Sequence, residues 1–366
     1  MTRLQDLYAE GGQSPWLDNL RRDWIRDGEL QRWVDRGVRG VTSNPSIFQK
    51  AIEGQAVYDE QFASLVGQGA SVTDAYWELV TTDIRDALEV LAPVHAASNG
   101  VDGYVSVEVA PDLAHDTAGT AAAAKALHAQ LAAPNLYVKI PGTAAGLPAI
   151  AEVIGGGGSV NVTLLFSLAR YGEVIDAYLE GLETCDGPLD HVSSVASFFV
   201  SRVDSAVDKA LDEIGSPEAL ALKGKAAVAN AQLAYELFLE RFSGKRWEAL
   251  AARGAKVQRP LWASTSTKDP SYPATLYVDT LIAPDTVNTM PEGTLDAFEA
   301  QGTVARTADA DLAGAHRVLD DLAELGIDLD AITDRLEDEG VASFQKAFDD
   351  LLGSLQAKAD QLAADT

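Results

Sequence analysis

The chain has 366 residues, of which 47% are hydrophobic and 23% charged, so it contains ample apolar material for a folded core. This composition excludes a disordered acidic chain, and the formal net charge of −27 argues against a nucleic-acid partner because the summed field repels phosphate backbones. Because Cys185 is the single cysteine, the chain can form neither an internal disulfide bond nor a cysteine-rich zinc site.

The sequence predicts neither a secretion signal nor a membrane span. The first residues lack the apolar segment of a signal peptide. The longest uncharged stretch, residues 153–169, is interrupted by four glycines and is shorter than the roughly 20 apolar residues that cross a bilayer. We therefore expect a cytoplasmic protein with no membrane partner.

Short apolar runs rich in β-branched residues alternate with helical patterns along the chain. Seven runs are clear, and an eighth, weaker run lies near residues 16–18. The seven are residues 38–42, 103–109, 136–140, 160–166, 192–200, 261–265 and 276–282. Such alternation predicts parallel strands joined by helical crossovers. An open doubly wound sheet and a closed (β/α)8 barrel both fit this order, and eight strands favour the barrel.

Helical patterns fill the intervals between these runs. Ser216, Pro217 and Glu218 have the order of a helix start, with a capping serine, a proline at the first position and an early acid. Residues 73–90 and 344–362 also have helical patterns. Because a barrel needs roughly 250 residues, we expect a single-domain α/β barrel over residues 1–366. Additional helices are expected around residues 48–100, 203–258 and 330–362.

Lys139 is the most informative polar residue on a predicted strand. It lies in the apolar run 136–140 and is followed by Ile140 and Pro141. Lysine is almost never fully buried unless it is paired, and burial is expected to lower its pKa toward the neutral amine. A neutral amine can attack a carbonyl carbon and form a Schiff base. The alternative is a lysine that reaches solvent at the strand end or pairs with a carboxylate.

Two carboxylates are candidates for acid and base chemistry near such an amine. Glu108 lies in the β-branched run 103–109, and Asp18 ends the weak first strand. A carboxylate on a buried strand is either paired or functional. A structural ion pair remains the alternative for Glu108, and a cap of a helix over residues 20–33 remains the alternative for Asp18.

Amide and hydroxyl groups follow or interrupt other predicted strands. Asn44 precedes Pro45 at the end of run 38–42, where it also suits an ordinary turn. Asn161 and Thr163 alternate on one strand, so both side chains point to the same face. If that face is the barrel interior, these residues present an amide and a hydroxyl group to a polar ligand.

Basic residues are scarce, so those near strand ends are informative. Arg202 follows the run 192–200, and Ser264, Ser266 and Lys268 follow residues 261–263. An arginine and a lysine beside hydroxyl groups can bind a phosphate, although surface ion pairing is the plainer alternative. The five histidines are scattered without the spacing of a metal site, and the glycines at 155–158 precede a strand and form no phosphate loop.

Five segments in this order resemble the transaldolase family. Each is modestly specific alone, and the ordered set is highly specific; the segments are residues 40–48, 105–109, 136–141, 161–166 and 197–202. Residues 280–291 are also similar to the loop around the last strand of the family. The resemblance implies a (β/α)8 barrel and a Schiff-base mechanism that needs no metal or organic cofactor.

The resemblance also implies roles for individual residues. Lys139 corresponds to the Schiff-base lysine, and Asp18 resembles the acid/base that handles the C4 hydroxyl proton. Glu108 and Thr163 are similar to the pair that holds the catalytic water. The groups that contact the dihydroxyacetone unit correspond to Asn44, Asn161 and Ser197, and the phosphate-binding positions to Arg202 and Ser264.

One departure from the family concerns phosphate binding. Well-known members carry an arginine two residues after the position of Ser264, where this chain has Ser266, and the nearest cation is Lys268. Lysine binds phosphate as a point charge and cannot form the planar fork of arginine.

The function expected from the resemblance is transfer of a dihydroxyacetone unit between sugar phosphates in the non-oxidative pentose phosphate pathway. The donors would be sedoheptulose 7-phosphate or fructose 6-phosphate, and the acceptors glyceraldehyde 3-phosphate or erythrose 4-phosphate. A lyase similar to fructose 6-phosphate aldolase and a non-catalytic sugar-phosphate-binding barrel are the alternatives, and a structural protein is a remote third. A homodimer is compatible with the sequence.

Overall fold

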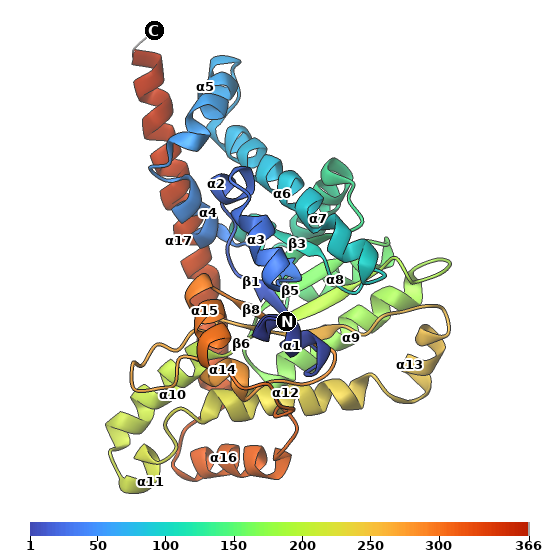
Figure 1. Cartoon of the computed structure of the whole chain (residues 1–366), viewed down its shortest axis with the longest axis vertical. Helices are drawn as coiled ribbons and strands as arrows, with labels where there is room; N and C mark the ends of the chain where they lie inside the picture. Colours follow the sequence, from blue (N-terminus) through green and yellow to red (C-terminus); the bar gives the residue numbers. More distant parts are fainter. Residues whose placement is uncertain (365–366) are drawn as a thin grey trace.

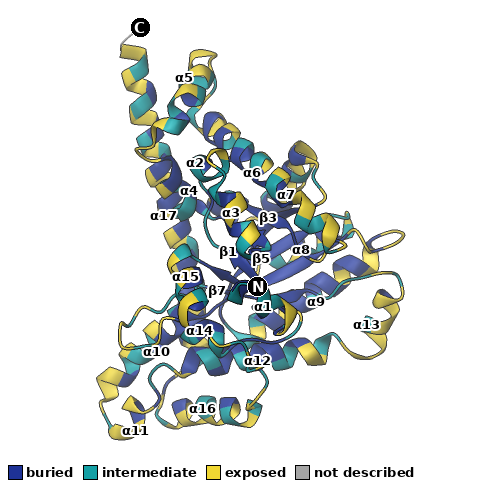
Figure 2. Ribbon diagram, viewed as in Figure 1, coloured by how far each residue is buried: buried dark blue, intermediate teal, exposed yellow. Residues whose placement is uncertain are grey.

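Eight parallel strands close into a barrel in chain order, and helices surround it (Figure 1). This is a computed structural model, and it describes residues 1–364. The predicted (β/α)8 barrel is confirmed. Every strand is buried along its length (Figure 2). The strands are β1 (Gln13–Leu17), β2 (Gly40–Val41), β3 (Tyr104–Glu108), β4 (Leu136–Pro141), β5 (Val160–Leu165), β6 (Ser194–Phe199), β7 (Arg259–Ala263) and β8 (Thr286–Met290).

The predicted strand at residues 276–282 is wrong. Its first residues form the short helix α14 (Leu276–Asp279), and the last strand β8 begins at Thr286, where it pairs with Gln13 of β1. The apolar run is buried because it packs outside the barrel, where the carbonyl of Leu281 accepts a hydrogen bond from Trp262 Nε1 at 2.9 Å. The real strand has the sequence TVNTM, in which three of five residues are polar, so it does not form an apolar run.

Strand β2 is the shortest, and its glycine is required by packing. A Cβ atom on Gly40 would lie 2.4 Å from the indole ring of Trp16, which is closer than real contacts allow. The ring of Trp16 is fully buried in the barrel and stacks on Tyr137 of β4 at a centroid distance of 6.1 Å. Glycine at position 40 therefore makes room for the indole that fills the barrel below the site.

Several helices or one long helix occupy three regions of the chain: between β2 and β3, between β6 and β7, and after α16 (Leu312–Glu324). In the first are α4 (Pro45–Ile52), η1 (Ala56–Tyr58), α5 (Asp59–Gly67) and α6 (Val72–Ala97). In the second are α10 (Ser201–Ile214), α11 (Pro217–Leu220), α12 (Ala226–Arg241) and α13 (Gly244–Ala251). In the third is α17 (Leu329–Ala364). Residues 365–366 of the expected domain lie outside the described residues.

The remaining helices lie mainly around the barrel, and two details differ from the sequence prediction. Ser216 caps α11 through Ala219 N, as expected, but this helix lasts only one turn. The helix considered over residues 20–33 is divided into α2 (Arg22–Arg26) and α3 (Glu29–Arg36) by Gly28 in a left-handed conformation. The others are α1 (Arg3–Ala9), η2 (Pro111–Leu113), α7 (Thr117–Leu131), α8 (Gly146–Gly155), α9 (Leu168–Thr184), α15 (Glu292–Gln301) and α16 (Leu312–Glu324).

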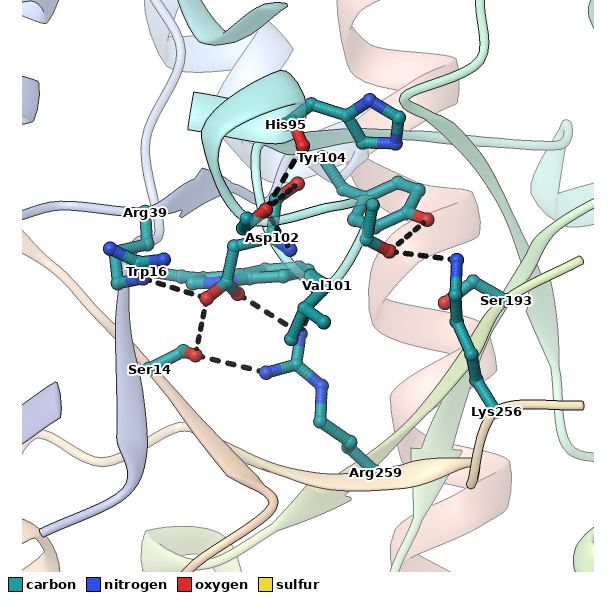
Figure 3. A network of polar contacts seen from close by, with 12 residues as sticks. Ser14, Trp16, Arg39, His95, Val101, Asp102, Tyr104, Ser193, Lys256 and Arg259 are labelled. Carbon is teal, nitrogen blue, oxygen red and sulfur yellow. Dashed lines mark hydrogen bonds and ion pairs between the residues drawn. The ribbon is translucent and has the colours of Figure 1, made fainter. Parts of the chain in front are cut away.

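A buried polar network closes the barrel at the amino ends of the strands (Figure 3). Asp102 accepts hydrogen bonds from Ser14 Oγ at 2.8 Å and Trp16 Nε1 at 3.1 Å, and it forms ion pairs with Arg39 and Arg259 at 2.7 and 3.0 Å. These partners come from β1, from the residue before β2 and from β7, so the network ties three parts of the barrel together at the closed end. The opposite, carboxyl end remains for a ligand.

Helix α17 is the longest helix in the described residues and runs past the barrel beside α4, as Figure 1 shows. It contacts α4, α6, α10 and strand β5, and its last turns extend beyond the body of the molecule near α5. Through residue 364, every helix is too short or too polar to serve as a membrane span.

Candidate active site

A cavity of about 380 Å³ lies at the carboxyl ends of the strands. Active sites of barrel enzymes lie at this end because the loops that follow the strands meet there. Most of the residues predicted from the sequence line the cavity: Asp18, Asn44, Lys139, Thr163, Ser197, Arg202, Ser264 and Lys268. The other two, Glu108 and Asn161, lie behind this lining and contact residues within it.

Lys139 is buried on β4, with only 4% of its surface exposed. Its Nζ atom lies 3.1 Å from Oε2 of Glu108 and donates a hydrogen bond to the backbone carbonyl of Ser43 at 3.0 Å. Lys139 therefore does not reach solvent, so that alternative is wrong. The other alternative, a lysine paired with a carboxylate, agrees with its contact with Glu108. Pairing and catalysis are compatible here, because the amine lies in the lining of an open cavity.

Glu108 is placed to exchange a proton with this amine. Burial raises the pKa of its carboxyl group, and the nearby Lys139 opposes that rise. Among the described residues, Thr163 Oγ1 is a buried oxygen without a hydrogen-bond partner, and the buried Oε2 of Glu108 has only its contact with Lys139 Nζ. Unpaired buried polar atoms are costly and usually mark a place for a ligand or a water molecule. These two suit the water-holding pair that the family resemblance implies.

A chain of hydrogen bonds orients the side chains on the neighbouring strands. Ser197 Oγ donates to Asn161 Oδ1 at 2.7 Å, and Asn161 Nδ2 donates to Ser106 Oγ at 3.1 Å. All three residues are buried, and Asn161 pairs with Lys139 in the β4–β5 register. The chain therefore holds Ser197 in a fixed position in the cavity wall.

Asn44 caps a helix and also lines the cavity. Its Oδ1 accepts a hydrogen bond from Ile47 N at 2.9 Å and so caps helix α4, while the residue lines the cavity. Because the cap occupies the side-chain oxygen, the amide nitrogen remains to donate to a ligand.

Asp18 follows β1 directly and is not a helix cap, because α2 begins at Arg22 and Arg21 occupies the capping position. Its Oδ1 accepts a hydrogen bond from Thr42 Oγ1 at 2.7 Å, and Thr42 in turn contacts Thr289 Oγ1 at 2.6 Å. Burial raises the pKa of Asp18, against the opposing effects of the Thr42 hydrogen bond and of Lys139. A carboxyl group in this state can both accept and return a proton.

Three basic side chains besides Lys139 line the cavity, and within residues 1–364 no carboxylate lies in ion-pair distance of any of the three. They are Arg202 at the start of α10, Lys268 in the loop after β7 and Lys50 on α4. Lys268 Nζ donates to Ser266 Oγ at 2.7 Å. Burial lowers the pKa of Lys268, and the charges of Arg202 and Lys50 lower it further. The surface ion pairs considered for Arg202 and Lys268 are thus absent from this part of the chain.

Sequence reasoning missed several lining residues. Ser46 and Lys50 are four residues apart on α4, so they share the face that follows the capping residue Asn44. That spacing is a signal that could have found Lys50. Phe344 comes from α17, more than 300 residues after Asp18, and no spacing in the sequence indicates its place.

The described residues contain no group of three or more histidine, cysteine, aspartate or glutamate side chains that could hold a metal ion. The geometry suits an enzyme for an anionic carbonyl compound, because a buried amine beside a carboxylate is placed within reach of unpaired cations. The fold and the site therefore define a barrel enzyme of the class that acts on anionic carbonyl compounds.

A family model described as transaldolase/fructose-6-phosphate aldolase matches residues 15–355. Curated relatives named transaldolase match nearly the whole chain. The protein from Parafrankia sp. (strain EAN1pec) is 51% identical over 366 residues, which cover 99% of both chains. The one from Acidothermus cellulolyticus is 52% identical over 357 residues, covering 96% of this chain and 95% of the relative.

Transaldolase 1 of Streptomyces avermitilis is 53% identical over 352 residues, which cover 95% of this chain and 93% of the relative. The chain belongs to the transaldolase/fructose-6-phosphate aldolase family. The resemblance drawn from the five segments is confirmed, as is the predicted class of enzyme, a transferase.

Proposed function

We propose that the chain works as a transaldolase in the non-oxidative pentose phosphate pathway. It transfers a dihydroxyacetone unit from sedoheptulose 7-phosphate or fructose 6-phosphate to glyceraldehyde 3-phosphate or erythrose 4-phosphate. The observation that carries this proposal is the buried amine of Lys139, which lies 3.1 Å from Glu108 in a cavity with unpaired cations.

The first step joins the donor to Lys139. The neutral amine attacks C2 of the ketose, and the carbonyl oxygen takes a proton to become a hydroxyl group. Loss of that hydroxyl group as water, with a proton from Glu108, forms the cationic imine. The buried oxygens Glu108 Oε2, which faces Lys139, and Thr163 Oγ1 offer two acceptors for this water.

The second step breaks the C3–C4 bond. Asp18 takes the proton of the C4 hydroxyl group, the C3–C4 electron pair moves to the imine, and an aldose phosphate leaves. The three-carbon unit remains on Lys139 as an enamine. Asn44 and Ser197 present an amide and a hydroxyl group to this unit from the cavity wall, and Asn161 supports Ser197 from behind.

The third step builds the product. The enamine carbon attacks the aldehyde carbon of the acceptor, Asp18 returns its proton to the new hydroxyl group, and the imine forms again. Water then adds to C2, Lys139 leaves as the free amine, and the new ketose phosphate is released. Arg202, Lys268 and the hydroxyl group of Ser264 bind the phosphate of donor and acceptor through charge-assisted hydrogen bonds.

A lyase that releases free dihydroxyacetone is the second candidate, because the family model covers both activities by its description. The full-length relatives named transaldolase favour transfer. The deciding assay supplies fructose 6-phosphate with and without erythrose 4-phosphate. We expect sedoheptulose 7-phosphate with the acceptor and little free dihydroxyacetone without it; efficient release without acceptor would instead support the lyase.

We further propose a cytoplasmic location and a single barrel domain over the chain, and a homodimer is the assembly to test first. The location is supported by Cys185, which is buried and is the single cysteine of the chain, so the fold uses no internal disulfide bond. Light scattering of the purified protein tests the assembly, and limited proteolysis tests the domain.

A further inference from the structure

Phe344 is the part of the cavity wall that comes from outside the barrel. The other lining residues belong to the strands or to the segments that directly follow them, whereas Phe344 lies on α17, after the eighth strand and its helix. Its side chain is buried, with 4% exposed. An aromatic ring at this place lies in the same cavity as Lys139.

Three residues at intervals of four along α17 face the open end of the barrel: Gly340, Phe344 and Phe348. A Cβ atom on Gly340 would lie 2.9 Å from the side chain of Leu164 on β5, so the helix approaches the barrel closely there. Phe348 contributes to a small void with Glu108 and packs edge-on against Tyr76 at a centroid distance of 5.2 Å. This face of α17 therefore covers both the cavity and the carboxylate beside Lys139.

Polar contacts hold α17 on both sides of this face. Before it, Glu337 pairs with Arg170 at 3.3 Å, and after it, Ser354 Oγ donates to Glu53 Oε1 at 2.8 Å. Further along, Lys358 pairs with Asp59. The helix is thus fixed to α9, to the residue that follows α4, and to α5, and the ring of Phe344 is held between these anchors.

We propose that Phe344 shields the three-carbon intermediate on Lys139 from water and so sets how that intermediate divides between transfer and release. This inference rests on the proposed function. Release needs a proton at the enamine carbon, then addition of water to C2 of the imine, and it frees dihydroxyacetone and the Lys139 amine. An apolar ring over the cavity reduces the access of water to both steps while an acceptor is awaited.

The test compares the rate of dihydroxyacetone release without acceptor with the rate of transfer to erythrose 4-phosphate. We expect Phe344→Ala to raise this ratio roughly tenfold. Phe344→Val also removes the ring and is the variant to use if the alanine protein fails to fold; the same direction is expected. Phe344→Met keeps an apolar side chain of similar length and is expected to retain a ratio near that of the wild type.

Leu355→Ala is the matched control on the same helix. Leu355 is 5% exposed and lies about three turns beyond Phe344, outside the cavity lining. We expect it to lower stability and leave the ratio unchanged. An unchanged ratio in Phe344→Ala and Phe344→Val, or an equal rise in Leu355→Ala, would overturn the inference.

Failure of the proposed function is recognised separately. Borohydride reduction of the wild-type protein with fructose 6-phosphate traps an adduct on Lys139 if the Schiff base forms. No adduct in the wild type would overturn the proposed function and this inference with it, whereas an adduct with an unchanged ratio would overturn only the role of Phe344.

Discussion

Lys139 and Glu108 are partners in the parallel register of β4 and β3, and both side chains point into the barrel with Nζ 3.1 Å from Oε2. The two strands therefore fix the distance between amine and carboxylate through their backbone pairing. Because both groups are at least 94% buried, solvent screens their interaction little. Proton exchange between them is the step on which the proposed chemistry depends.

Glu108→Gln tests this exchange. The amide keeps the shape of the side chain and cannot carry the proton, so we expect Schiff-base formation to slow by roughly 100-fold or more. Burial raises the pKa of Glu108. In the wild type, the rate of Schiff-base formation is therefore expected to fall toward acidic pH with a midpoint above the pKa of an exposed glutamate. The variant is expected to lack this fall in rate. Rapid-quench trapping across a pH series measures both effects.

Glu152→Gln is the control for that experiment, since Glu152 also pairs with a lysine, Lys125 at 2.5 Å, but both side chains are about half exposed. It is expected to behave as the wild type. A Glu108→Gln protein that forms the adduct at the wild-type rate, with the same pH profile, would contradict the role of Glu108.

Asp18→Asn separates bond cleavage from imine formation. Without a base for the C4 hydroxyl group, the donor still joins Lys139 but its C3–C4 bond stays intact. Mass analysis after borohydride reduction is expected to find the whole six-carbon donor on the protein, where the wild type retains three carbons. Asp23→Asn, near Asp18 but paired with Arg21, is the control. Three-carbon adduct at the wild-type rate in Asp18→Asn would exclude Asp18 as the base.

The three unpaired cations predict a graded loss of phosphate binding. Hydrogen bonds to charged groups contribute about 1.5–3 kcal/mol, so Arg202→Ala is expected to raise KM for fructose 6-phosphate by roughly 10-fold to 100-fold. Lys50→Ala and Lys268→Ala each remove one point charge and are expected to raise KM less. Steady-state kinetics with fructose 6-phosphate and with unphosphorylated fructose measure the effect.

Only the reaction of the phosphorylated sugar is expected to respond to these three substitutions. Lys346→Ala removes an exposed lysine of α17 that pairs with Asp350, and it serves as the control for a change in net charge. Equal losses for both sugars in Lys50→Ala would show that Lys50 does not act on the phosphate.

The buried carboxyl group of Asp204 lies outside the cavity lining, and we expect it to make the free energy of unfolding depend on pH. Burial raises its pKa to about 6, against hydrogen bonds from Ala227 N and Tyr277 Oη, both 2.7 Å. The folded protein therefore binds the carboxyl proton of Asp204 more tightly than the unfolded chain does. The contribution of Asp204 to the free energy of unfolding consequently falls as pH rises from about 4 to 6. Between pH 4.5 and 7.5 the wild type is expected to lose about 2 kcal/mol relative to Asp204→Asn.

Urea unfolding of both proteins at several pH values measures that difference. A constant difference between the two free energies of unfolding across this range would contradict the raised pKa of Asp204.

Much of the barrel and of its chemistry could be predicted from the sequence, because a charge on an apolar strand is conspicuous. Lys139 and Glu108 each stand out in a run of β-branched residues, and the structure brings them together through strand register. Strand β8 could not be found in this way, because Asn288 and its neighbouring threonines interrupt its apolar pattern.

Residues that reach the cavity by helix packing were beyond sequence reasoning. Phe344 looks like one more apolar position on a long amphipathic helix, and only the packing of α17 across the barrel places it in the cavity. Lys50 looks like a surface lysine until helix α4, capped by Asn44, carries it to the cavity.

The most direct measurement of the central claim is borohydride reduction of the protein in the presence of fructose 6-phosphate, followed by mass mapping of its peptides. We expect a three-carbon addition on the peptide that contains Lys139 and no addition in Lys139→Ala. A protein that transfers the three-carbon unit at full rate with no adduct at Lys139, or with full activity in Lys139→Ala, would contradict it.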